Sequence, residues 1–243
     1  MLLAIDIGNT NITFGLFKQN KLVKVFNIPT KSYNIGIFKK KLGKLGFSDT
    51  IICSVVPKIT RVLAHDLRGI VNTRALVVGQ DIMVPIKNCY RKPKQVGQDR
   101  LVNAYAGVKL YGKPLVVVDF GTAVTFDVIS NKGEYLGGMI IPGLGVSLDA
   151  LSKYTALLPK VRLEPPKEFI GRDTKSSILS GVVYGYAALC DDLSARIKSK
   201  IGTKAKVIGT GGNVALIGKY CKSLDRVNKN LTLLGLNLLN KRS

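Results

Sequence analysis

The chain of 243 residues has no tryptophan, a single histidine and only four cysteines. His65 falls in a segment with helical periodicity, and no nucleophile motif such as G-x-S-x-G accompanies it, so neither a Ser-His-Asp nor a Cys-His relay is expected. The cysteines Cys53, Cys89, Cys190 and Cys221 are scattered and form no C-x-x-C pair. We therefore expect neither a disulfide framework nor a zinc site, and the composition fits a protein of the reducing cytoplasm.

The chain also lacks a long apolar run. No stretch of about 18 apolar residues is free of charge, so we expect no membrane-spanning segment and no membrane partner. The N-terminal residues MLLAIDIGN contain no basic region, and Asp6 interrupts their apolar run. They therefore do not resemble a signal peptide.

Acidic residues are scarce, with 15 Asp and Glu against 37 Lys and Arg and a net charge of +22. Such a charge is typical either of a nucleic-acid-binding protein or of an enzyme with a lysine-rich surface. The basic residues are spread along the chain and form no stripe interleaved with aromatic residues, which favours the enzyme and makes nucleic acid an unexpected partner. The same positive field attracts an anionic substrate such as a nucleotide.

Each half of the chain shows the same order of elements: three strands, followed by alternating helices and strands. The expected strands are 2–6, 11–18, 21–28, 50–56 and 75–79 in the first half, and 114–120, 123–130, 133–142 and 205–210 in the second. The expected helices are 36–47, 59–70, one opening at 97–100, 144–153, 174–199 and one starting near 212. This repetition indicates an α/β fold made of two duplicated domains, which we place at residues 1–111 and 112–243.

The expected helix 174–199 carries a broad apolar face. Burial within its own domain and burial in a subunit interface explain that face equally well, so the sequence leaves both open.

Two short segments end an apolar strand with the same motif. AIDIGNTNITF (4–14) and VVDFGTAVTF (117–126) both read Asp, any residue, Gly and a small polar residue, and, with one gap, end in Thr-Phe. A glycine turn after a strand places backbone N–H groups and hydroxyls where an anion can bind, and Asp6 can hold a divalent cation through water. A plain hairpin turn would explain one copy, whereas two copies favour a phosphate site.

Two further segments carry candidate site residues. VIGTGGN (207–213) runs from a strand through a glycine turn into a helix, and it is neither a P-loop nor a Rossmann fingerprint. GQDR (97–100) opens an amphipathic helix. Asp99 is either an acid favoured by the helix dipole or a general base beside a cationic anchor, Arg100, and spacing alone does not decide.

Together these motifs resemble the type III pantothenate kinase family over nearly the whole chain. The matching segments, in order, are DIGNT (6–10), VGQDR (96–100), VDFGTA (118–123), GGMIIPG (137–143), TALLP (155–159), IGRDT (170–174) and GTGGN (209–213). The resemblance implies two ribonuclease-H-like domains of the actin-like ATPase type that hold ATP between them. It also implies transfer of the γ-phosphoryl group of ATP to pantothenate, the first step of coenzyme A synthesis, with Mg²⁺, a monovalent cation (potassium or ammonium) and a homodimer.

The resemblance also implies roles for individual residues. Asp99 is the base that accepts the proton of the pantothenate hydroxyl, Asp119 holds the monovalent cation and Asp6 lies near magnesium. The residues expected at ATP are Asp6, Ile7, Gly8, Asn9, Thr10, Asn11, Ile12, Thr13, Thr122, Gly209, Gly211 and Gly212. The residues expected at pantothenate are Tyr90, Gly97, Gln98, Asp99, Arg100 and Thr174.

The chain departs from the family pattern at Gln98, where alanine is common, and around Tyr90, where NCYRKPKQVG is unusually basic. Gln98 keeps open a kinase of this fold that phosphorylates another small hydroxylated acceptor. A transcriptional accessory factor of the same fold also stays open, because some relatives are described in this way and a net charge of +22 would suit contact with nucleic acid. The presence of Asp6, Asp99 and Asp119 favours a catalyst over a binding module.

Overall fold

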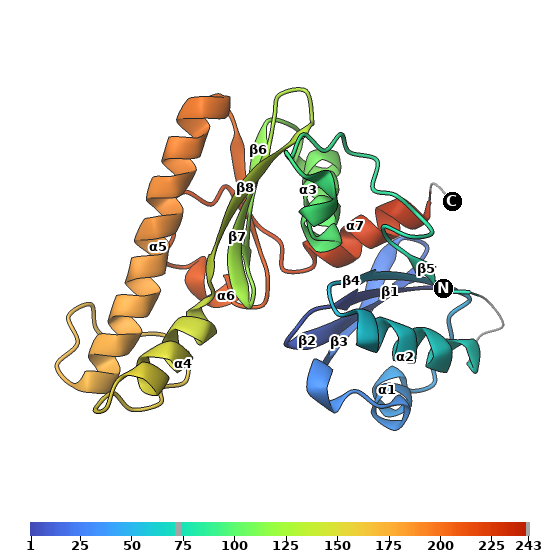
Figure 1. The fold of residues 1–243 in the computed structure, drawn as a ribbon, viewed down its shortest axis with the longest axis horizontal. Helices are drawn as coiled ribbons and strands as arrows, with labels where there is room; N and C mark the ends of the chain where they lie inside the picture. The colour runs from blue at the N-terminus through green and yellow to red at the C-terminus, as the bar shows by residue number, and fades with distance from the viewer. Residues whose placement is uncertain (71–73, 242–243) are drawn as a thin grey trace. The chain divides into compact units, whose positions relative to one another are not determined.

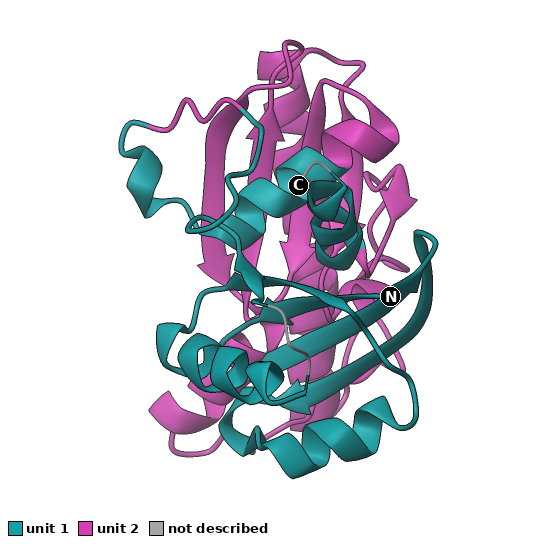
Figure 2. Cartoon of the chain, turned by 90° about the vertical axis from the view of Figure 1, so that its right-hand side faces the viewer, with its two compact units in different colours: residues 1–86, 91–106, 231–243 teal, residues 87–90, 107–230 magenta. Residues whose placement is uncertain are grey.

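The computed structural model describes residues 1–70 and 74–241, shown as a ribbon in Figure 1. Contacts divide the chain into two compact units, which Figure 2 distinguishes by colour. Unit 1 comprises residues 1–86, 91–106 and 231–243, and unit 2 comprises residues 87–90 and 107–230.

Each unit contains a five-stranded sheet, and the two sheets have the same topology. Unit 1 orders its strands β3-β2-β1-β4-β5, and unit 2 orders them β8-β7-β6-β9-β10. In both sheets the first strand pairs antiparallel with the second and parallel with the fourth. The strands are β1 (Leu2–Ile7), β2 (Asn11–Lys18), β3 (Lys21–Pro29), β4 (Asp49–Ser54), β5 (Leu76–Val77), β6 (Leu115–Phe120), β7 (Ala123–Ile129), β8 (Tyr135–Pro142), β9 (Lys206–Thr210) and β10 (Arg226–Val227). The expected α/β duplication is confirmed.

The hairpin between β2 and β3 turns at Gln19 and Asn20, the two residues that separate the expected strands 11–18 and 21–28. Their φ angles are 47° and 68°, the left-handed region that a type I′ hairpin turn requires at both central positions. The turn joins the two strands that form one edge of the unit 1 sheet.

In unit 1 the alternation of β1 side chains builds a core on each face of the sheet. Leu3 and Ile5 pack into one core with helices α1 (Ile35–Leu42) and α2 (Pro57–Arg68). Ala4 packs into the other with α3 (Gln98–Tyr111) and α7 (Leu231–Asn240). Because successive strand residues point to opposite faces, this central strand is apolar almost throughout.

In unit 2 the sheet packs against α4 (Leu144–Tyr154), α5 (Thr174–Ile201) and α6 (Val214–Ile217). The long helix α5, orange in Figure 1, buries one face in this core, where Val183 and Ala187 lie beside Val118 of β6. Burial within its own unit therefore accounts for part of the apolar face of α5.

Helix α7 and the short strand β10 have no counterpart among the expected elements. α7 contacts β1, β2 and β4, so contacts assign residues 231–243 to unit 1, although the sequence placed them in the C-terminal domain. The first boundary also differs, since the larger segment of unit 2 begins within α3 at Gly107 and residues 87–90 belong to unit 2 as well. The domain ranges 1–111 and 112–243 stay a prediction. Within residues 1–70 and 74–241, no helix is long and apolar enough to span a membrane.

Candidate active site

Asp6 is the half-buried acidic residue of β1. In the sheet register it lies opposite Thr13 of β2 on one side and Cys53 of β4 on the other. The neighbouring Ile5 and Ile7 are fully buried, so the strand is fixed by its core and delivers the carboxylate to the end of the sheet where β1 turns.

The turn after β1 spans residues 8–10 and is fastened to Thr30. The Gly8 N–H donates to the carbonyl of Asn11 at 3.0 Å. The Thr30 hydroxyl donates to the Gly8 carbonyl at 2.7 Å, and the Thr30 N–H donates to the Thr10 carbonyl at 2.9 Å. These bonds occupy carbonyl groups of the turn and leave the side chains of Asn9, Thr10 and Asn11 exposed to solvent, which suits a loop that meets an anionic ligand.

Asp99 lies in the first turn of α3 and is half-buried. The Arg100 N–H donates to Asp99 Oδ1 at 2.9 Å. A Cβ at Gly97 would collide with the same oxygen, so glycine at this position leaves the carboxylate its space. Burial raises the pKa of Asp99 above its ordinary value, against the opposing effect of the Arg100 N–H and charge, and a raised pKa suits a general base.

Asp6 and Asp99 come from segments 93 residues apart, and both act on the buried thiol of Cys53. Burial raises the pKa of Cys53 well above its usual range, and the charges of Asp6 and then Asp99 raise it further. Both carboxylates therefore lie within electrostatic range of the same buried thiol in unit 1. Cys53 was not among the expected site residues, because a cysteine in the apolar run TIICSVV shows no functional signal in the sequence.

Gln98 lines a pocket of about 460 Å³ in unit 1. A Cβ at Gly79, where φ is +83°, would lie 2.7 Å from Gln98 Cδ and 2.9 Å from its Cγ. The Gln98 side chain thus packs directly on the Gly79 backbone. Arg61, Arg68 and Arg74 also line this pocket, so the residue beside the candidate base is next to a basic cavity.

Asp119 has the equivalent place in unit 2. It lies in β6 opposite Thr125 of β7 and Thr210 of β9. A Cβ at Gly211, where φ is +94°, would collide with Asp119 Oδ1, and one at Gly121 would lie 3.2 Å from it. The glycines therefore let two backbone turns approach one carboxylate closely.

The structure thus brings Asp119, Gly121 and the glycine turn 209–212 together. The Asn213 N–H also donates to the Phe120 carbonyl at 3.1 Å, which ties the end of that turn to β6. Thr122, the next residue of the β6–β7 turn, is exposed, and its carbonyl accepts the Gly143 N–H at 3.0 Å. In this part of the site the expected ATP residues and the expected cation residue are neighbours.

Tyr90 lies in the segment 87–90, which belongs to unit 2, whereas Gly97–Arg100 belong to unit 1. A Cβ at Gly137 of β8 would lie 3.3 Å from the Tyr90 ring, whose centroid is 6.5 Å from that of Tyr135. The Tyr135 hydroxyl donates to Asp127 Oδ1 at 2.9 Å. Asp127 is fully buried, and its position within a strand gives no functional signal in the sequence.

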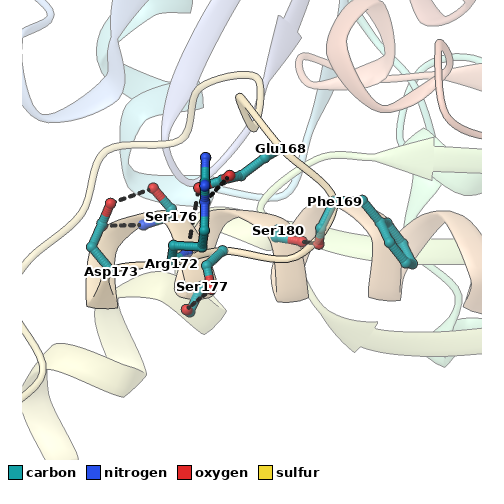
Figure 3. Close-up of polar contacts among 8 residues, drawn as sticks. Glu168, Phe169, Arg172, Asp173, Ser176, Ser177 and Ser180 are labelled. Carbon is teal, nitrogen blue, oxygen red and sulfur yellow. Dashed lines mark hydrogen bonds and ion pairs between the residues drawn. The ribbon is translucent and has the colours of Figure 1, made fainter.

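Thr174 begins α5, and Figure 3 shows the polar contacts around this helix start. Asp173 caps the helix, accepting the Ser176 N–H and hydroxyl, each at 2.8 Å. Arg172 pairs with Glu168 at 2.9 Å, and the Ser180 hydroxyl donates to the Phe169 carbonyl. Thr174 and its neighbours line a second, open pocket of about 710 Å³, so this threonine is available to a ligand that binds there.

The donor sets fit the cations that the family resemblance implies. Carboxylate and carbonyl oxygens are the ligands of hard cations such as Mg²⁺. The close approach of Gly121 and Gly211 to Asp119 leaves a cradle that a larger side chain would fill, and Asp6 stands beside an exposed turn. No sulfur or imidazole ligand belongs to either group of expected site residues.

The chain matches the family model described as type III pantothenate kinase over residues 2–196. A type III pantothenate kinase from Anaeromyxobacter dehalogenans (strain 2CP-C) is 40% identical, with 100% of each chain covered. This match extends over both units.

Solved structures with low identity share the fold. A Campylobacter jejuni protein assigned to the Baf family of transcriptional activators has a TM-score of 0.64 at 23% identity, covering 99% of this chain and 98% of that one. The activator of the 2-hydroxyisocaproyl-CoA dehydratase from Clostridium difficile, with bound ADPNP, has a TM-score of 0.55 at 12% identity, covering 98% and 92%. Such distant likenesses establish the actin-like ATPase and sugar kinase fold and nothing about activity.

Proposed function

The chain belongs to the type III pantothenate kinase family, and we propose that it phosphorylates pantothenate with ATP, using Asp99 as the general base. One observation carries the assignment of the base. Asp99 is a half-buried carboxylate in the first turn of α3, and Gly97 leaves space for its Oδ1. Burial also raises its pKa, and a carboxylate with a raised pKa suits the acceptance of a hydroxyl proton in phosphoryl transfer.

In the proposed reaction Asp99 accepts the proton of the pantothenate hydroxyl as that oxygen attacks the γ-phosphorus. A new oxygen–phosphorus bond forms, the bond from the γ-phosphorus to the bridging oxygen breaks, and ADP leaves with the electron pair. No covalent enzyme intermediate is required, because such transfers rely on positioning and charge neutralisation.

The two strand-end turns are proposed to position the nucleotide. The turn in 6–13 binds the phosphates through N–H groups and hydroxyls, Thr122 contacts the phosphates, and the glycines Gly209, Gly211 and Gly212 lie beside the nucleoside. Asp6 would hold Mg²⁺, in part through water, and Asp119 would hold potassium or ammonium. The cations, when bound, supply positive charge that neutralises the phosphates.

The acceptor site is proposed to contain Tyr90, Gly97–Arg100 and Thr174. Support comes from the space that Gly97 leaves for Asp99 and from the open pocket that Thr174 lines. We also propose that the enzyme is a homodimer of the cytoplasm, as the family resemblance implies.

The deciding assay measures ADP release from ATP and Mg²⁺ with the purified protein. We expect release that depends on pantothenate and is stimulated by potassium. ATP turnover without any response to pantothenate would reject this acceptor and favour another hydroxylated substrate. A protein that binds duplex DNA at physiological salt and has no turnover would favour the accessory factor, because diffuse electrostatic binding weakens steeply with salt.

A further inference from the structure

Unit 2 contains a cluster of two thiols and a carboxylate that the proposed reaction does not use. Cys190 and Asp191 are neighbours on α5, and Cys221 lies in the loop after α6. One ligand atom from each residue lies within 4.8 Å of the other two. Among residues 1–70 and 74–241, no other group of three His, Cys, Asp or Glu side chains meets this criterion.

Asp191 holds the Cys221 loop against α5. Its Oδ1 accepts the N–H of Lys222 at 2.9 Å and that of Ser223 at 2.8 Å. These two amides directly follow Cys221, so the hydrogen bonds hold the backbone that carries its thiol. The arrangement is ordered by the fold and does not depend on the flexible ends of long side chains.

The two thiols already interact with each other. The Cys221 thiol hydrogen-bonds to Cys190, which lowers the pKa of Cys190 and raises the pKa of Cys221. Cys190 is fully buried, and its Sγ lies 3.7 Å from the hydroxyl of Ser223. Cys221 is half-buried, so an ion has a path to the cluster from solvent.

We propose that Cys190, Asp191 and Cys221 form a binding site for a thiophilic divalent cation of the zinc class. Thiolate sulfur selects such ions over magnesium and calcium, and zinc accepts two sulfurs, a carboxylate oxygen and a water in a tetrahedron. Zinc–sulfur bonds of about 2.3 Å place tetrahedral sulfurs about 3.8 Å apart. The two sulfurs lie within 4.8 Å of each other in the structure, so they need to approach by about 1 Å or less to bind one zinc ion.

The sequence did not reveal this site because its ligands are not arranged as C-x-x-C pairs. Cys190 and Cys221 are 31 positions apart, and the fold supplies their proximity. The ion would bridge α5 to the loop that leads from α6 to β10, and its binding would stabilise the folded state over the unfolded chain.

The test is a titration of the full-length protein with Co²⁺, after reduction and removal of metals under anaerobic conditions. We expect about one equivalent to bind, with thiolate-to-cobalt charge-transfer absorption and the intense visible bands of tetrahedral cobalt, and we expect Zn²⁺ to displace it. Zn²⁺ should also raise the melting temperature of the reduced protein.

Matched variants assign the ligands. Cys221→Ser, at a partly exposed position, and Cys190→Ser should each lose the charge-transfer band, whereas Cys89→Ser, at an exposed position outside the cluster, should keep it. Asp191→Asn should weaken binding by roughly 10-fold or more, because even outer-shell partners contribute 10- to 100-fold. Circular dichroism of each variant checks that it is folded.

Two results would overturn the proposal. The first is the absence of a charge-transfer band when Co²⁺ is added to the reduced, folded wild-type protein. This result would count against the site even if Cys190 and Cys221 form a disulfide when air is admitted. The second is an unchanged band in folded Cys221→Ser, which would place the ion elsewhere.

Discussion

The strand-end carboxylates of the two units occupy equivalent positions but have different neighbours. Asp6 of β1 lies opposite the buried Cys53 of β4. The charge of Asp99 also raises the pKa of this thiol. Asp119 of β6 lies opposite Thr210 of β9, and the backbones of Gly121 and Gly211 approach its carboxylate closely. The two aspartates therefore have the same place in their sheets but different neighbouring groups.

This difference favours a division of labour after duplication. Unit 1 adds a second carboxylate, Asp99, whose charge reaches the same buried thiol as that of its strand-end acid, and the raised pKa of Asp99 suits proton transfer. Unit 2 surrounds its acid with close backbone turns, which suits the binding of a cation and a nucleotide. The following predictions test whether the two units differ in this way.

Asp99→Asn should have the largest effect. We expect turnover to fall by roughly 10²- to 10⁴-fold, the contribution of a general base, with ATP affinity retained. Steady-state kinetics and ATP titration measure the two quantities. Asp49→Asn, at an exposed position at the start of β4, is the control and should be active, and near-normal turnover of Asp99→Asn would exclude the base role.

Gly211→Ala should damage unit 2 specifically. Its Cβ would be strained at φ +94° and would strike the Asp119 carboxylate and the Phe120 backbone, so we expect a loss of at least about 2 kcal/mol in the free energy of unfolding. Urea denaturation gives this value.

The neighbouring Gly212→Ala provides a matched control. A Cβ at Gly212 meets no atom within 4 Å, so the free energy of unfolding should change by less than about 0.5 kcal/mol. Equal stability of the two variants would show that the packing around Asp119 is not as close as described.

Gln98→Ala tests the acceptor side of unit 1. Removal of the side chain that packs on Gly79 should change the pantothenate KM by less than about tenfold, since one packing contact is worth about 1.4 kcal/mol or less, and should leave kcat near that of the wild type. Gln80→Ala, in the same pocket, is the control. A large loss of kcat would mean that Gln98 positions Asp99.

Titration of Asp99 should change the free energy of unfolding and the turnover in opposite directions, and this effect should be small. Burial raises the pKa of Asp99 above 3.8, so the folded state binds this proton more tightly than the unfolded state does. As pH rises from below 3.8 through the raised pKa, the wild type should lose stability relative to Asp99→Asn while its turnover increases. Denaturation and kinetics over a pH series measure both trends, and a wild type that gains stability relative to the variant over this range would contradict the raised pKa.

The sequence predicted the parts of the fold that depend on local patterns. Apolar runs ending in Asp-x-Gly fixed the first strands of both sheets, and Gln19-Asn20 marked a hairpin. The sequence did not predict α7, because residues 231–240 are apolar without a clear periodic face. The helix packs on β1 and β4, and such contacts with distant segments are not visible in a local pattern.

The candidate site was predictable to a similar extent. Motifs identified Asp6, Asp99 and Asp119 individually, but no spacing showed that Cys53 would stand near two of them. The packing of Gln98 on Gly79 and the burial of Asp127 likewise depend on contacts between distant segments. Burial and proximity of this kind come from the folded chain.

Cation dependence in Asp6→Asn and Asp119→Asn tests the central claim most directly. Turnover of each variant is measured while Mg²⁺ and potassium are varied separately. Asp119→Asn should lose potassium stimulation and keep a near-normal Mg²⁺ dependence, whereas Asp6→Asn should require more Mg²⁺ and keep its response to potassium. The same change in both variants would contradict the claim that the two units use equivalent carboxylates differently.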